Sequence, residues 1–128
     1  MSRRRTKDVS VENTRLGAGE ITVQVIPDSD QITIAVTGRV TVDSSPQLRA
    51  VVLEVLRRGA APLTVIDLSG VSYLDMSGLA TLLESLKAAR ERSVKLRVTG
   101  MNGEARNLAE IAQLDAIFGA WGSEVAFR

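Results

Sequence analysis

The stretch DMSG, residues 75–78, holds the side chains that best suit chemistry in this chain. An apolar run ends just before it and leucines at helical spacing follow it, so these residues should join a strand to a helix. In that position Ser77 suits a helix N-cap, Asp75 adds favourable charge near the helix start, and Gly78 allows close packing. The alternative is that the Ser77 hydroxyl is a site of modification.

The chain contains no histidine and no cysteine among its 128 residues. Ser–His triads, cysteine nucleophiles and histidine-ligated metals are therefore excluded, and neither common glycine-rich phosphate loop is present. We predict that the protein is not an enzyme and binds no cofactor or metal. A small enzyme or nucleotide-binding domain is the least favoured alternative, because Asp67 is expected to be a buried strand-end carboxylate rather than an acid catalyst.

The composition fits one folded domain with an aliphatic core, since 45% of the residues are hydrophobic and only 3% are aromatic. No apolar run approaches the roughly 20 residues that cross a bilayer, so we predict no integral membrane segment. The net charge of +1 gives no global case for nucleic-acid binding. The lack of cysteine fits a reducing compartment, and the cytoplasm is the expected location.

Basic residues gather at the start of the chain. Residues 1–20 contain five basic and three acidic residues, a net charge of +2. We expect residues 1–19 to form a flexible basic tail and residues 20–128 to form the domain, with a nucleic-acid-binding arm as the alternative for the tail.

Hydrophobic periodicity predicts alternating strands, helices with one apolar stripe and a nearly continuous apolar central strand. The expected strands are 20–26, 31–38, 63–70 and 94–100, and the expected helices are 42–59, a helix after Ser77, and 102–114. Residues 115–127 have two interpretations: a short strand, or a segment that packs Ile117, Phe118 and Trp121 over a sheet edge. This order, β-β-α-β-α-β-α, predicts an α/β domain with a mixed, mostly parallel sheet of four to five strands and three to four helices.

The helix expected over residues 42–59 has signals at both ends. Ser44 or Ser45 is predicted to cap it, and Gln47, three residues after Ser44, completes a capping-box pattern. Gly59 is predicted to end it.

Loops 38–45, 69–77 and 99–103 should meet at the carboxyl edge of the sheet, where α/β proteins usually place their sites. Small polar residues are expected to line that surface: Thr41, Asp43, Ser44, Asp75, Ser77 and Asn102. Without a proton-transfer agent, such a surface suits docking better than catalysis.

Phosphorylation would suit this surface. A phosphoserine adds about −1.5 to −2 charge at pH 7, which free N–H groups at a helix N-terminus accommodate. A partner packed against the surface would be repelled, particularly if it presents carboxylates. The expected result is an intact fold and a lost complex.

The segment "LTVIDLSGVSYLDMSGLATLLESLKAAR" resembles the signature of STAS domains, the family of bacterial anti-sigma factor antagonists, and "GRVTVDSSPQLRAVV" is similar to the family's earlier segment. The resemblance runs from about residue 20 to residue 118. It implies that the unphosphorylated protein binds an anti-sigma factor serine kinase and so frees a sigma factor. The kinase then phosphorylates the serine before the glycine, Ser77, and a cognate phosphatase resets the switch.

The resemblance also implies where the partner binds. The family's motifs map to Thr41, Asp43 and Asp75. With the neighbouring residues of the same loops, the expected partner-binding residues are Thr41, Asp43, Ser44, Asp75, Met76, Gly78 and Asn102. The chain departs from the family in two places: Met76 replaces a common serine, and Arg39 and Thr41 replace an acidic pair. The second hypothesis is a STAS subunit of a stress-sensing complex or of a phospholipid-transport ATPase. The oligomeric state is left open.

Overall fold

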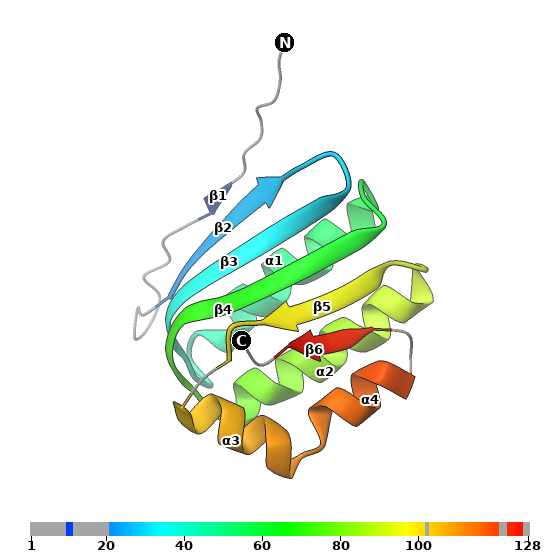
Figure 1. The fold of residues 1–128 in the computed structure, drawn as a ribbon. Coiled ribbons are helices and arrows are strands. Elements are labelled where there is room, and N and C mark those ends of the chain that lie inside the picture. Colours follow the sequence, from blue (N-terminus) through cyan, green and yellow to red (C-terminus); the bar gives the residue numbers. More distant parts are fainter. Residues whose placement is uncertain (1–9, 12–20, 102, 121–122, 127–128) are drawn as a thin grey trace.

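The computed structural model describes residues 10–11, 21–101, 103–120 and 123–126, which form one mixed sheet with helices packed against it (Figure 1). The elements are β1 Ser10–Val11, β2 Ile21–Pro27, β3 Gln31–Val40, α1 Ser45–Arg58, β4 Leu63–Leu74, α2 Met76–Glu91, β5 Lys95–Thr99, α3 Gly103–Ile111, α4 Leu114–Ala120 and β6 Glu124–Ala126. None of the helices described is both long and apolar enough to span a bilayer.

The sheet confirms the predicted fold class and order of elements. Its strands lie in the order β1-β2-β3-β4-β5-β6. The pairs β1–β2 and β2–β3 are antiparallel, and the remaining pairs are parallel. In the view of Figure 1, α1 and α2 lie behind the sheet, and α3 and α4 lie along its lower edge beside β6.

The six-stranded sheet is larger than the predicted four to five strands, because two short edge strands complete it. β6 is the final strand that the sequence left open. β1 was not predicted, since two residues are too few to show alternation. Apart from β1, the predicted flexible tail of residues 1–19 lies outside the described residues.

The core is aliphatic, as predicted, and lies between the sheet and the helices. Alternate residues of the strands face it, and Ile34 and Ile66 are fully buried. The predicted leucine stripe of α2 is likewise buried at Leu79, Leu82 and Leu86. Burial of each such side chain favours folding by about 1.5–3 kcal/mol, so this stripe fixes α2 on the sheet.

The ends of α1 match the predictions only in part. Gly59 ends the helix in the left-handed conformation, with φ 58°, as expected. The prediction of a capping box is wrong, because Ser44 occupies the N-cap position but its side chain makes no capping hydrogen bond. Its hydroxyl instead donates to the Arg39 carbonyl at 2.7 Å and accepts the Thr41 N–H at 2.9 Å, because a tight turn precedes the helix.

β4 continues to Leu74, beyond the predicted end at residue 70. Its pairing with β3 shifts register twice, between Ala35 and Thr37 and again between Gly38 and Arg39. At each shift β4 contains an extra residue, the pattern of a β-bulge, which bends the strand. The final pair is Val40 with Leu74, so both strands deliver their following loops to the same place.

The helix predicted over residues 102–114 is present as α3 but is shorter, and a second helix follows in the segment that the sequence left ambiguous. α3 ends at Ile111, and α4 begins at Leu114. Gln113 between them has φ 56°, a left-handed conformation that interrupts a helix. Phe118 is buried and Ile117 is exposed in α4, a segment that the sequence left ambiguous.

Candidate functional site

The first turn of α2 is capped by Asp75, not by Ser77. Oδ1 of Asp75 accepts the backbone N–H of Ser77 at 2.9 Å and that of Gly78 at 3.2 Å. The prediction that Ser77 is the N-cap is therefore wrong: the helix begins at Met76, and Ser77 is already inside it. An aspartate caps as well as a serine, and its carboxylate adds charge complementary to the helix dipole. The Ser77 hydroxyl is not needed as a cap.

The Ser77 side chain is partly exposed, and its hydroxyl donates to Oδ1 of Asp75 at 2.5 Å. The backbone carbonyl of Ser77 accepts the Thr81 hydroxyl at 3.0 Å, one turn along α2. The serine is thus held at the surface, at the N-terminus of a helix, and is not turned into the core.

The Asp75 carboxylate is stabilised in its charged form. Partial burial alone would raise its pKa, but hydrogen bonds from the Ser77 hydroxyl and from the backbone of Gly78, Ser77 and Val42 outweigh that effect. The net result is a pKa below the ordinary aspartate value.

Two of the three predicted loops meet at Asp75. Its backbone N–H donates to the Val40 carbonyl at 3.1 Å, and its carboxylate accepts a hydrogen bond from the backbone of Val42. The loop after β3 is therefore joined to the loop after β4, as expected.

The third predicted loop, after β5, lies close to β4. A Cβ at Gly100, just after β5, would lie 2.5 Å from the backbone nitrogen of Ser69. Asn102, predicted for the same surface, lies outside the described residues.

Gly78 fixes how closely α2 approaches the sheet. A Cβ at this position would lie 2.8 Å from Cγ of Leu74 and 2.9 Å from Cγ1 of Val40. The predicted close packing is thus present. Gly78 is buried, so its role is to let α2 pack closely on the sheet, and it presents no surface to a partner.

The predicted surface residues of the loop after β3 divide into two kinds. Asp43 is exposed and Thr41 is half-buried, with its hydroxyl accepting the Asp43 N–H at 3.2 Å. Ser44 is only 2% exposed, so the expectation that its side chain lines the surface is wrong. Its hydroxyl is used inside the turn, where it holds the loop in shape.

Three residues near the ends of β3 and β4 expose large apolar side chains, and two of them, Val42 and Tyr73, were not predicted as site residues. Val42 is 68% exposed, Met76 63% and Tyr73 38%. The guanidinium of Arg39 lies 4.5 Å from the centre of the Tyr73 ring, a cation–π contact. A valine in a loop otherwise made of small polar residues was the available signal for Val42. We call residues 41–43 and 75–77 together the Ser77 rim.

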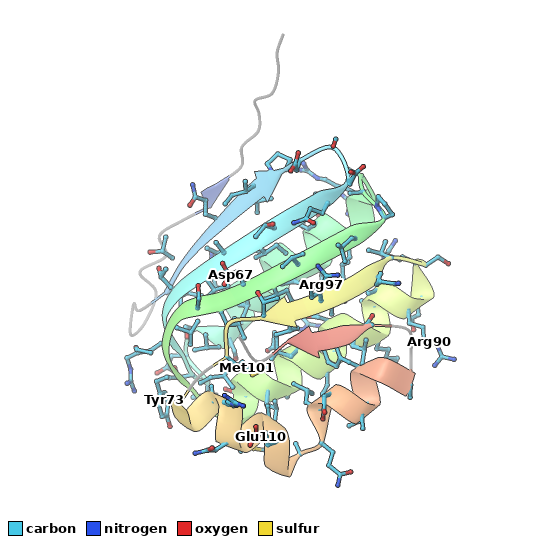
Figure 2. The ribbon with its side chains drawn as sticks, in the orientation of Figure 1. Asp67, Tyr73, Arg90, Arg97, Met101 and Glu110 are labelled. Atoms are coloured by element: carbon cyan, nitrogen blue, oxygen red, sulfur yellow. The ribbon has the colours of Figure 1, made fainter. Side chains whose placement is uncertain are left out.

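The rim offers a hydroxyl and a carboxylate that accepts its hydrogen bond. In the described part of the chain no three acidic residues lie close enough together to hold a metal ion. Asp67, expected to be buried, is half-buried and accepts the Ser69 N–H at 2.9 Å. Figure 2 shows Asp67 in the middle of the sheet and Tyr73 at the far end of β4.

Known proteins share this fold and sequence pattern. Residues 23–119 match the family model described as "Mlab, STAS domain". An anti-sigma-B factor antagonist of Listeria monocytogenes is 32% identical over 90 residues, which cover 70% of this chain and 78% of that protein. The chain therefore belongs to the STAS domain family of bacterial anti-sigma factor antagonists.

Solved structures agree on the fold. An anti-sigma factor antagonist from Mycobacterium paratuberculosis superposes with a TM-score of 0.69 at 24% identity, covering 77% of this chain and 82% of that one. The phosphorylated form of the Bacillus cell fate determinant SpoIIAA superposes with a TM-score of 0.61 at 16% identity, covering 84% of this chain and 93% of that one.

Proposed function

We propose that this protein is an anti-sigma factor antagonist that acts in the cytoplasm as a binding module, not as an enzyme. Its unphosphorylated form binds an anti-sigma factor serine kinase and frees a sigma factor, and phosphorylation of Ser77 ends that binding. A phosphatase restores the unphosphorylated form. The observation that carries the proposal is the partly exposed Ser77 hydroxyl at the N-terminus of α2.

The hydroxyl is suitably placed for phosphoryl transfer. Because it donates its proton to Asp75, the lone pairs of its oxygen are directed away from the carboxylate. In the transfer the Ser77 oxygen bonds to the γ-phosphorus of ATP, the bond to ADP breaks, and the hydroxyl proton passes to a base of the kinase.

The added phosphate changes the charge of the rim more than its shape. It brings about −1.5 to −2 charge beside the Asp75 carboxylate, where the helix N-terminus partly compensates it. The SpoIIAA structure is of a phosphorylated form and has the same fold, which supports tolerance of the phosphate by this architecture. A partner lying on the rim would face the new charge directly.

The test is phosphorylation by the purified anti-sigma factor kinases of the source organism with radiolabelled ATP. We expect one phosphate per chain, abolished in Ser77→Ala and retained in Ser72→Ala, an exposed serine of β4. Ser77→Asp should keep its thermal unfolding midpoint and bind the kinase weakly. Labelling that persists in Ser77→Ala would place the modification elsewhere and overturn the proposal.

A further inference from the structure

Two residues with exposed apolar side chains, Val42 and Met76, are joined to Ser77 by the chain or through Asp75. Met76 precedes Ser77 in the chain, and the backbone of Val42 is bonded to the same carboxylate as the Ser77 hydroxyl. Val42 at 68% and Met76 at 63% are the most exposed large hydrophobic side chains of the described residues. Large apolar side chains that two joined loops both leave exposed favour a role in binding a partner.

We propose that Val42 and Met76 form the apolar contact by which the kinase of the proposed function recognises this protein, and that the kinase presents an apolar recess to them. The inference rests on that proposed function. To bring ATP to the Ser77 oxygen, the kinase must approach between these side chains and cover both. Oδ1 of Asp75 is occupied by hydrogen bonds from Ser77 and Gly78, so the apolar side chains are the groups of this surface left to a partner's recess.

The same contact makes the phosphate a more effective switch. Covering Val42 and Met76 removes water from around Ser77, and charges interact about four times more strongly at an effective dielectric constant of ~20 than in water at ~80. The repulsion between phosphoserine and the kinase therefore grows with the closeness of the apolar contact. Met76 should influence both the affinity of the complex and its sensitivity to charge at Ser77.

Met76→Ser tests both effects, with Met76→Leu as the apolar rescue. Ile26→Ser is the matched control, since Ile26 is 45% exposed and pairs with Thr33 near the start of β3, at the opposite end from the rim. The dissociation constant of each variant for each purified anti-sigma factor kinase of the source organism is measured by calorimetry, with Ser77 intact and with Ser77→Asp.

We expect Met76→Ser to weaken binding about tenfold, and Met76→Leu and Ile26→Ser to leave it within about threefold. The loss of affinity for the kinase that Ser77→Asp causes should be smaller in the Met76→Ser background than in the unsubstituted protein. If unphosphorylated Met76→Ser binds the kinase with an unchanged dissociation constant, and the kinase still phosphorylates Ser77 in this variant, the inference is overturned and the proposed function stands. If the unsubstituted protein binds none of the kinases, the proposed function fails and the inference fails with it.

Discussion

The Ser77 hydroxyl and both first-turn N–H groups that Asp75 caps converge on one atom, Oδ1 of Asp75. The carboxylate thus holds the start of α2 and orients the serine at the same time. Because the backbone of Val42 also donates to this carboxylate, one side chain fixes both halves of the rim. The consequences for stability can be measured without knowing the partner.

Asp75→Ala should lower the free energy of unfolding by about 0.5–2 kcal/mol, because the first turn of α2 loses its cap. Asp75→Asn should retain most of the stability, since an asparagine oxygen caps the same N–H groups. Urea unfolding followed by circular dichroism measures both. Asp43→Ala, in the exposed part of the same rim, is the control and should change stability by less than about 0.5 kcal/mol. Equal losses from Asp75→Ala and Asp43→Ala would contradict the capping role.

The stabilisation by Asp75 should depend on pH. Its pKa is lowered in the folded protein, so at acid pH the folded state binds fewer protons than the unfolded chain, in which aspartate has a pKa of about 3.9. The contribution is therefore complete above that value and is lost as the pH falls through the folded pKa.

The measurement is the difference in unfolding free energy between the unsubstituted protein and Asp75→Asn, at several pH values from about 6 to about 3. We expect the difference to narrow as the pH falls. The comparison is needed because Glu54 titrates in the same range: hydrogen bonds from Arg57 and Arg58 lower its pKa to about 2. A difference that stays constant to the lowest pH would show that the Asp75 charge is not stabilising.

Gly78→Ala should destabilise the protein by about 1–3 kcal/mol, because the new methyl group would press on Leu74 and Val40. Gly119→Ala is the matched control: it is also a helical glycine, but its added Cβ would meet nothing within 4 Å. That substitution should be neutral or stabilise by up to about 1 kcal/mol, since alanine favours helix. The measurement is the thermal unfolding midpoint of each variant. A similar shift of the midpoint in both variants would show that α2 does not pack closely on Leu74 and Val40.

Much of the fold followed from periodic patterns. The alternation in the segments around Val23 and Ile34 predicted the strands β2 and β3, and the leucine spacing predicted the buried face of α2. Gly59 marked the end of α1. These patterns involve residues that are close in the sequence, so they can be recognised without knowledge of the tertiary structure.

The site was predicted less completely, because its details depend on contacts between distant segments. Ser44 and Ser77 both look like caps in sequence, yet the tight turn before α1 uses one hydroxyl and the Asp75 carboxylate replaces the other. The end of β4 was missed because its apolar residues do not alternate regularly there. The exposure of Val42 was signalled only by its position in a loop of small polar residues, since an apolar residue is usually expected in the core.

The two bulges of β4 together preserve the parity of the strand. Ile66 and Leu74 are both buried in the core, although two register shifts separate them. The first extra residue of β4 reverses which residues face the core, and the second extra residue restores the original alternation. Adding or removing one residue in the stretch between them would invert this alternation unless the pairing gained or lost a bulge. Without such a compensating bulge, Leu74 would point at solvent, and the start of α2, which carries Ser77, would lose its seat on the sheet.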